Sequence, residues 1–464
     1  MSHSKLCAAC IAVLVGTFAR AESILDADKE RKVAELLRES GAPSVSVAVA
    51  ERGAVVYARA FGKAALSPDR AADPSTRYFV GSISKQFTAA AVLLAAEAGK
   101  LTLDDPVSKY YPELTRAGDI TIRQLLSHTS GYEDYAPQDY SIPEWAHSTS
   151  PDAVIKAWAG RPLDFEPGTR WQYSNTNYVL AARILEKATG ESLVPFLRRT
   201  IFEPLGMTSA TDGYVERRAS DAVPYTRFGL GPPRPAVPEA PGWYHGAAEL
   251  AMTPSDLARW DIAVLRRRIL SEKSYRDFTG AVSLRNGDLT HYALGLGVGE
   301  MDGIPEISHS GEVAGFLTYN SIFPTRDTAV VVCSNEDSVV VARTVARQLA
   351  RWVVEAEDAA ASEASPAEMK QVASILDGLR HGTVDRSLLT PNASFYFSSA
   401  ALADIRGSLR PLGVVKAIER TRQDHRGGMI FREYKVEFEK GAVEIWVYLT
   451  PQGRYEQFLI AQDV

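Results

Sequence analysis

The chain has 464 residues, 45% of them hydrophobic and 23% charged, which is an ordinary composition for a globular protein and enough for more than one domain. Its formal net charge of -6 excludes the strongly basic surface that binding to a nucleic-acid backbone requires. We therefore expect no nucleic-acid partner.

The first residues have the pattern of an export signal. Lys5 precedes an apolar run over residues 6–18, and Ala19-Arg20-Ala21 matches the small-residue pattern of a cleavage site. We predict a signal peptide over residues 1–21 and a periplasmic or secreted mature protein, with an uncleaved N-terminal anchor as the alternative. Once the signal is removed, no later segment is long and apolar enough for a stable membrane span.

The cysteines and histidines predict neither a disulfide nor a metal site. Cys7 and Cys10 would leave with the signal peptide, so the mature chain keeps Cys333 and forms no internal disulfide. Five histidines lack the H-x-x-x-H and paired-cysteine spacings of metal ligands, and we expect no metal and no cofactor. They are His128, which we expect to be structural in LSHTSGY, and His147, His245, His291 and His381.

Residues 22–357 predict one domain in which strand and helix patterns are mixed without an internal repeat. Strand-like runs lie at its two ends and helix patterns lie between them. The strands are expected over 44–62, around an Arg52-Gly53 turn, and in three runs over 306–335; the helices are expected over 85–98, 178–189 and 338–357. This order predicts an α+β fold, with an antiparallel sheet that both ends complete, flanking helices and a helical insert.

A second, smaller domain follows a linker. Residues 358–368 are rich in small residues and predict the linker, and residues 369–464 begin with a helix pattern and end in a meander of strands. The tail is therefore predicted to be a small α+β domain. Its helix before a curved antiparallel sheet resembles the NTF2-like cone fold.

The segment GSISKQFTAAAVLLAAEAGKL, residues 81–101, places Ser82 and Lys85 three positions apart at the start of an apolar helix. On a helix these two side chains share a face, so the amine can reach the hydroxyl. Lysine becomes a base for serine when burial lowers its pKa, and the apolar residues behind the pair favour that burial. The same spacing occurs at Ser2 and Lys5, so a helix cap beside an exposed lysine remains the alternative.

A second pattern is Tyr173-Ser174-Asn175, which precedes another apolar helix pattern. A phenol near a serine can carry a proton, and a carboxamide can hold a substrate carbonyl. Polar residues at this place also make a good helix start, so a simple turn is the alternative.

A third pattern is His309-Ser310-Gly311, which ends a predicted strand and is followed by Glu312. Backbone N–H groups there could form half of an oxyanion hole, and the glycine would allow a close approach of ligand. The same H-x-G spacing occurs at residues 425–427, so a polar strand end is the alternative.

Taken together and in this order, the three patterns resemble the serine β-lactamase and penicillin-binding-protein superfamily, most of all class C β-lactamase-like esterases and D-amino-acid peptidases. The resemblance covers residues 30–355. It extends to LTLDDPVSKYYPEL, ITIRQLLSHTSGY, FEPGTRWQYSNTNYVLAARILEKATGESL, IFEPLGMTSATDG and GAAELAMTPSDLARW.

The resemblance implies a role for each matching residue. Ser82 would be the acylated nucleophile, Lys85 the group that deprotonates it, and Tyr173 the proton carrier for the leaving group and for water. Asn175 would bind the substrate amide. The oxyanion would lie between the backbone N–H groups of Ser82 and Glu312.

His309, Ser310, Gly311 and Glu312 would form the substrate-binding strand. Typical β-lactamases and penicillin-binding proteins have lysine where His309 stands. A charged ammonium suits a substrate carboxylate, whereas histidine is mostly neutral at pH 7. The resemblance therefore implies an esterase or a peptidase more than a β-lactamase.

Our main hypothesis is an exported serine hydrolase that cleaves an ester or amide, such as a small ester or a D-amino-acid peptide, through an acyl-enzyme on Ser82. The substrate would be a small molecule or a peptide. One alternative is a penicillin-binding or peptide-binding sensing module with little turnover. In another reading, the tail domain recognises a partner and docks the hydrolase to it.

Overall fold

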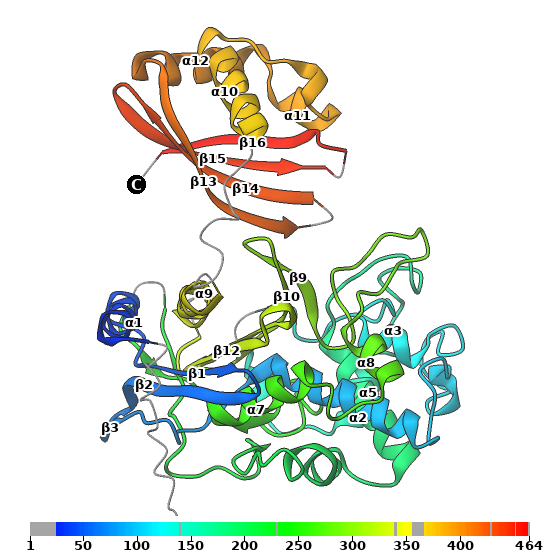
Figure 1. Cartoon of the computed structure of the whole chain (residues 1–464). Helices are drawn as coiled ribbons and strands as arrows, with labels where there is room; N and C mark the ends of the chain where they lie inside the picture. The colour runs from blue at the N-terminus through cyan, green and yellow to red at the C-terminus, as the bar shows by residue number, and fades with distance from the viewer. Residues whose placement is uncertain are drawn as a thin grey trace, which may run out of the picture.

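The computed structural model describes residues 25–138, 141–228, 231–337, 341–354, 366–426, 429–450 and 452–462. These residues contain two larger antiparallel sheets, one of seven strands and one of four (Figure 1). The predicted signal peptide lies outside the described residues, as does most of the predicted linker.

The seven-stranded sheet joins the two ends of the first domain. Its order is β3-β2-β1-β12-β11-β10-β9, so the first and last strands of the domain pair at its centre, from Val45 with Ser334 to Glu51 with Thr328. The strands are β1 (Ser44–Glu51), β2 (Ala54–Leu66), β3 (Asp69–Ala71), β9 (Gly297–Met301), β10 (Ile304–Val313), β11 (Phe316–Phe323) and β12 (Thr328–Ser334). The predicted α+β fold, with a sheet completed by both ends, is confirmed.

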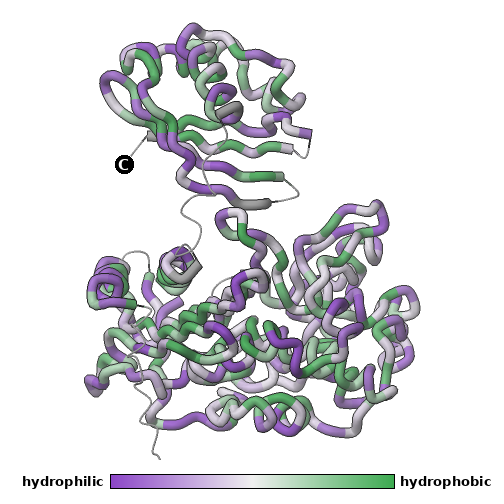
Figure 2. Tube along the Cα trace, in the orientation of Figure 1, coloured by the Kyte–Doolittle hydropathy of each residue, from purple (hydrophilic) through white to green (hydrophobic). Residues whose placement is uncertain are grey.

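Helices cover both faces of this sheet. On one face lie α1 (Ala27–Ser40) and α9 (Val341–Val354), which contact each other, and on the other lies α7 (Pro254–Leu265). Successive side chains of a strand point to opposite faces. In β1 the valines therefore join the core beneath α1 and α9, while the alanines join the larger core on the α7 side. Figure 2 shows hydrophobic residues along the sheet and hydrophilic residues along α1.

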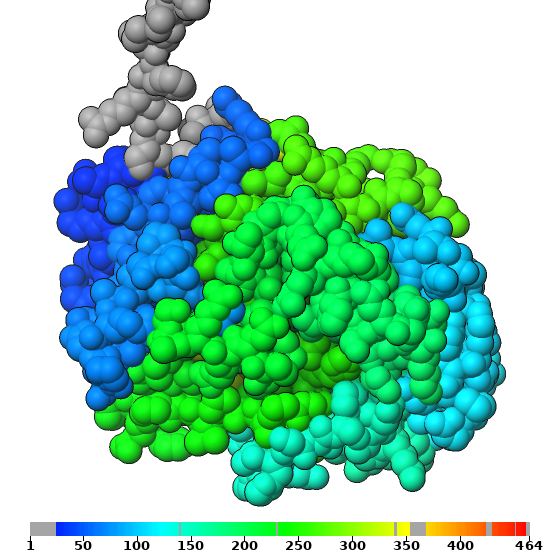
Figure 3. Space-filling model, turned by 90° about the horizontal axis from the view of Figure 1, so that it is seen from below, coloured from blue at the N-terminus to red at the C-terminus, as the bar shows by residue number. Residues whose placement is uncertain are grey.

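The insert between β3 and β9 is mainly helical. Besides α7, its helices are α2 (Ser84–Glu97), α3 (Ile122–Leu126), α4 (Pro151–Trp158), α5 (Asn175–Thr189), α6 (Leu193–Leu197) and α8 (Glu272–Thr279). Its short strands are β4 (Tyr78–Phe79), β5 (Thr211–Asp212), β6 (Tyr225–Thr226), β7 (Arg234–Pro235) and β8 (Leu250–Met252). Figure 3 shows the molecule from below. Segments coloured from blue to green, including parts of this insert, form most of the face seen there.

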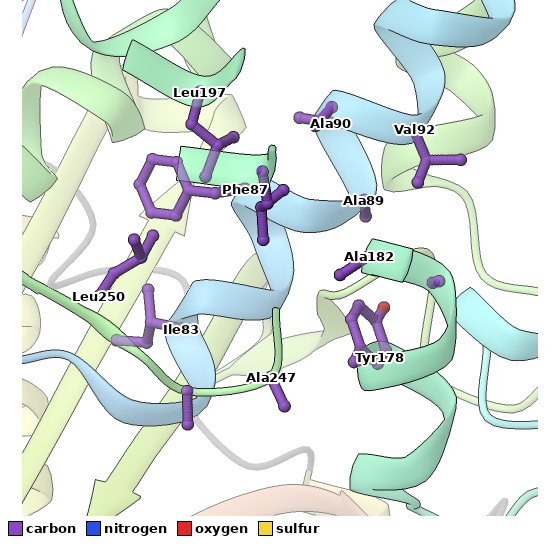
Figure 4. Close-up of a cluster of buried hydrophobic side chains, with 14 of the residues drawn as sticks. Ile83, Phe87, Ala89, Ala90, Val92, Tyr178, Ala182, Leu197, Ala247 and Leu250 are labelled. Carbon is purple, nitrogen blue, oxygen red and sulfur yellow. The ribbon is translucent and has the colours of Figure 1, made fainter. Parts of the chain in front are cut away.

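Helix α2 runs through the middle of the insert and is buried along most of its length. Its run of alanines allows close packing by neighbouring elements, because alanine adds little bulk to the helix surface. Figure 4 shows Ile83 and Phe87 on one side of this region and Tyr178 and Ala182, from α5, on another. The start of α2 is therefore held rigidly inside the core, which suits a site that needs fixed geometry.

The C-terminal part packs helices on one face of a four-stranded sheet of order β13-β14-β15-β16 (Figure 1). Its elements are α10 (Pro366–His381), α11 (Pro391–Tyr396), α12 (Ser399–Leu409), β13 (Val415–Arg426), β14 (Met429–Phe438), β15 (Gly441–Leu449) and β16 (Tyr455–Gln462). The separate small α+β domain is confirmed, and its likeness to an NTF2-like cone stays a prediction. Helix α10 begins earlier than residue 369, since Pro366 suits a first helical turn.

A buried ion pair ties the start of the insert to its middle. Arg77 is 2% exposed and donates hydrogen bonds to both carboxylate oxygens of Asp221, each at 2.7 Å. Replacing Asp221 with alanine should lower the free energy of unfolding by about 3–5 kcal/mol, because the guanidinium would stay buried without its counter-ion.

Urea unfolding of the wild type and the variant measures this loss. The matched control is Asp69→Ala, which removes an exposed ion pair with Lys63 and should cost less than about 1 kcal/mol. Equal losses in the two variants would contradict the assignment of a large contribution to the buried pair.

No helix within the described residues is both long enough and apolar enough to cross a bilayer.

Candidate active site

Ser82 and Lys85 meet where a short turn enters α2. Ser82 lies in the 3₁₀ turn Gly81–Ile83, and Lys85 lies in the first turn of α2. The Lys85 side chain is fully buried, and its Nζ lies 3.0 Å from Ser82 Oγ. The spacing of three residues therefore brings the amine to the hydroxyl, as the sequence pattern predicts.

The ammonium nitrogen of Lys85 has two further partners that orient it. It donates to Asn175 Oδ1 at 2.8 Å and to the carbonyl oxygen of Ala247 at 3.0 Å. These two oxygens can only accept, so they take two N–H groups of Lys85 in either protonation state. When the amine is neutral, its lone pair is left to face Ser82 Oγ and can accept the hydroxyl proton.

Burial sets the charge state of Lys85. It lowers the pKa of Lys85 from its usual 10.5 to about 7, although the nearby Asp134 carboxylate raises it in part. A large share of the amine is therefore neutral near pH 7. A buried lysine in this state is suited to act as a general base.

Asn175, the first residue of α5, is held from behind by Asp134. The Asp134 carboxylate accepts the backbone N–H of Asn175 at 2.9 Å and its side-chain amide at 3.2 Å. These contacts turn the amide oxygen of Asn175 toward Lys85. Asn175 thus positions the lysine as well as lining the cleft. Burial raises the pKa of Asp134, and the hydrogen bond from the backbone N–H of Asn175 lowers it in part.

Tyr173 lines the same cleft, and the centroid of its ring lies 4.8 Å from Lys85 Nζ. Burial raises the pKa of Tyr173, and a hydrogen bond with Ser82 lowers it in part. The phenol is therefore neutral near pH 7. Lys85, and not a tyrosinate, is the base that the resting site presents to Ser82.

Strand β10 passes directly beside the Ser82 turn. Its neighbour β9 pairs with it only from Ile304 to Ser308, and beyond that point β10 contacts the 3₁₀ turn. A Cβ atom on Gly81, whose φ is +53°, would lie 2.4 Å from the Glu312 nitrogen, and one on Gly311 would lie 1.8 Å from the Val80 oxygen. Two glycines thus allow the backbones of Ser82 and Glu312 to lie together, as an oxyanion hole requires.

The His309 side chain is buried and does not line the cleft wall. Its Nε2 lies 2.8 Å from the Tyr292 hydroxyl, and its Nδ1 contacts the carbonyl oxygen of Ser310. A carbonyl only accepts, so Nδ1 carries the hydrogen and Nε2 accepts from Tyr292. Burial lowers the pKa of His309 to about 4, with a further contribution from Lys85, so the ring is neutral near pH 7.

The residues of the predicted substrate-binding strand therefore differ in whether they line the cleft. Ser310 is exposed, Gly311 is buried, and Glu312 lines the cleft together with the two residues after it. The tight contact between His309 and Tyr292 explains why this ring does not face the cleft. The sequence pattern does not indicate that partner, which lies 17 positions away.

The cleft beside Ser82 has a volume of about 570 Å³. Its walls combine aromatic rings with carboxylates, and no lysine, arginine or histidine is among the described residues that line it. The aromatic and acidic residues are Trp145, Trp171, Tyr173, Tyr244, Asp134, Glu239, Glu312 and Asp337. Within the described part of the chain, histidine, cysteine and acidic side chains form no cluster of the kind that holds a metal ion.

Comparison with known proteins agrees with this geometry. The family model described as Beta-lactamase matches residues 30–355. The chain belongs to the beta-lactamase family. Ser82, Lys85, Tyr173 and the strand from His309 to Glu312 all lie within the matched residues.

Individual proteins resemble the chain in sequence or in fold. It is 30% identical to the putative penicillin-binding protein PbpX of Bacillus subtilis over 317 residues, which cover 68% of this chain and 76% of the relative. The octameric penicillin-binding protein homologue from Pyrococcus abyssi has a TM-score of 0.63 at 20% identity, covering 94% of this chain and 100% of its own.

A third similar protein is the D-amino acid amidase from Ochrobactrum anthropi SV3. Its structure in complex with L-phenylalanine amide has a TM-score of 0.61 at 21% identity, covering 71% of this chain and 100% of its own. At this identity the likeness establishes the shared fold.

Proposed function

We propose that this beta-lactamase family member is an exported serine hydrolase that cleaves an ester or an amide through an acyl-enzyme on Ser82. The observation that carries the proposal is the orientation of Lys85. Two acceptor oxygens hold its N–H groups, its remaining position faces Ser82 Oγ at 3.0 Å, and burial lowers its pKa to about 7. That arrangement activates a serine nucleophile.

The reaction follows from these positions. Lys85 takes the proton of Ser82 as its oxygen attacks the carbonyl carbon, and the negative oxygen that forms is held by the backbone N–H groups of Ser82 and Glu312. The proton then passes from Lys85 through the Tyr173 hydroxyl to the leaving alcohol or amine as the bond to it breaks. Water then attacks the carbonyl carbon of the acyl-enzyme, and its proton follows the same route in reverse, through Tyr173 to Lys85. The acid is released as the bond to Ser82 breaks and Ser82 takes its proton back.

The charges of the cleft support an esterase or peptidase more than a β-lactamase. A penicillin carries a carboxylate, which needs a cationic partner, and His309 is neutral and bonded to Tyr292. No lysine, arginine or histidine is among the described residues that line the cleft, so they offer that carboxylate no cationic partner. The cleft suits a neutral ester or an amino-acid amide with a free ammonium group, and the amidase-like fold agrees with the second class.

The pattern at the N-terminus supports export, with the active domain working in the periplasm or outside the cell. The alternative function, a binding or sensing module, needs no activated nucleophile, and the orientation of Lys85 toward Ser82 argues against it.

Steady-state assays on three probes test the substrate class. They are a neutral p-nitrophenyl ester, a D-amino-acid p-nitroanilide with a free amine, and a penicillin. We expect kcat/KM for the ester or the anilide to exceed that for the penicillin, because the described cleft lining offers the penicillin carboxylate no cationic partner. Efficient hydrolysis of the penicillin would contradict the assignment, and binding of all three without turnover would favour the sensing module.

A further inference from the structure

His128 has an unusual place in the fold beside the proposed proton carrier. It lies just after α3, is 0% exposed, and has a backbone φ of +58°. Left-handed backbone is uncommon for residues other than glycine, and such conformations are frequent near functional sites. The sequence alone indicates only a structural histidine in LSHTSGY.

Three contacts connect His128 with Tyr173 and with the two residues beside it in the chain. The carbonyl oxygen of His128 accepts the backbone N–H of Gln172 at 3.0 Å, and its Nδ1 accepts the backbone N–H of Ser174 at 3.1 Å. The His128 ring also packs on the Tyr173 ring, with centroids 4.3 Å apart and planes inclined by 35°. The same residue thus holds the chain on both sides of Tyr173 and supports the ring between them.

The chemical state of His128 suits this role and excludes proton transfer. Since Nδ1 accepts from Ser174, the ring hydrogen is on Nε2, and the ring is neutral. Burial, with Lys85 nearby, lowers the pKa of His128 well below its usual 6.5. Aromatic rings of Trp171, Tyr178 and Tyr292 surround it, with centroids 4.9 to 6.1 Å away. His128 does not line the cleft, so it acts through another residue.

Tyr173 needs such support because of where it lies. Residues 169–174 have no regular secondary structure, and α5 begins only at Asn175. A proton carrier works only when its oxygen is within about 2.6–3.2 Å of the groups that exchange the proton. A loop without a tether would not keep the Tyr173 hydroxyl at that distance.

We propose that His128 is a positioning residue that holds the Tyr173 hydroxyl in line between Ser82 and the leaving group. The proposal rests on the proposed function of Tyr173 as the proton carrier. Loss of His128 should therefore lower activity in the same way as loss of the Tyr173 hydroxyl. The loss of activity should be largest for substrates whose leaving group must be protonated.

The test uses His128→Asn and His128→Gly, which both tolerate a positive φ and both lose the ring. Asparagine keeps an acceptor near the position of Nδ1 for the Ser174 N–H, and glycine does not. We would measure kcat/KM for a p-nitrophenyl ester and for the ethyl ester of the same acid, together with Tyr173→Phe and the double variant His128→Gly/Tyr173→Phe. Nitrophenolate leaves without a proton, whereas ethoxide needs one.

We expect His128→Gly to lower kcat/KM for the ethyl ester by about 10- to 100-fold, but by less than about fivefold for the nitrophenyl ester. His128→Asn should recover most of the loss, and the double variant should lose little beyond Tyr173→Phe alone. Equal losses on both esters, or losses in the double variant that multiply, would overturn the positioning role while leaving the hydrolase intact. Full activity of Tyr173→Phe on the ethyl ester would instead refute the proposed proton carrier and this proposal with it.

Discussion

Replacing Lys85 with methionine should lower kcat by about 10²- to 10⁴-fold, the range that a positioned general base contributes. Methionine matches the length of the lysine stem and suits the buried start of α2, but it cannot take the proton of Ser82. It also removes an amine that is costly to bury, so the folded state should persist. The measurements are kcat on a p-nitrophenyl ester and the Tm.

The pH profile identifies the same group independently. Because the pKa of Lys85 is lowered to about 7, the fraction of neutral amine rises as pH rises through 7 and is complete well above it. The wild-type kcat/KM should therefore increase by up to about tenfold per pH unit below 7 and level off above. Residual activity of Lys85→Met should lack this rise.

The matched control is Lys156→Met, the same change at an exposed position on α4, which should alter neither kcat nor the profile. If Lys85→Met kept the wild-type rise near pH 7, a different group would be the base.

Replacing Gly311 with alanine should lower kcat by about 10²- to 10³-fold, the usual effect of losing one oxyanion donor. The new Cβ would lie 1.8 Å from the Val80 oxygen, so β10 has to move away from the Ser82 turn. That movement separates the Glu312 N–H from the Ser82 N–H, and the two can no longer hold one oxygen. Initial rates on the ester measure the loss, and circular dichroism verifies that the sheet remains.

Gly299→Ala provides the comparison, since it makes the same change on the adjacent strand β9, where an added Cβ meets nothing within 4 Å. It should keep wild-type activity. Comparable kcat values for the Gly311 and Gly299 variants would mean that the close approach of β10 is not part of the catalytic geometry.

Local patterns were enough to predict the main elements of the fold. The Arg52-Gly53 turn joins β1 and β2, and the apolar run after Ser82 forms α2, because both signals lie within one segment. Strand β13 was not predicted. Its residues VKAIERTRQDHR are largely charged, so the alternation that marks a half-buried strand is hidden.

The residues of the candidate site also differ in whether the sequence predicted their contacts. Ser82 and Lys85 are three residues apart, so helix geometry alone predicts their contact. Asn175 reaches Lys85 across 90 positions, and only the family resemblance pointed to that proximity. The carbonyl of Ala247 carries no side-chain signature at all, and Asp134 lies in a loop without any pattern of its own, so neither was predicted.

His309 shows a different limit of the sequence pattern. The motif placed it beside the substrate, but a side chain's direction depends on partners that are distant in sequence. The Tyr292 hydroxyl donates a hydrogen bond to one ring nitrogen, and the adjacent Ser310 carbonyl accepts one from the other. The ring is therefore held in a buried position, and it is neutral. The absence of a cation at this place was predictable from the residue type, whereas the orientation of the ring was not.

Intact mass spectrometry after brief incubation with a p-nitrophenyl ester is the most direct test of the proposed chemistry, with nitrophenol release followed in the same tubes. We expect either rapid turnover or a mass increase equal to the acyl group in the wild type, and neither in Ser82→Ala. Equal turnover or an equal adduct in Ser82→Ala would show that Ser82 is not the nucleophile and that the hydrolase does not work through an acyl-enzyme on this residue.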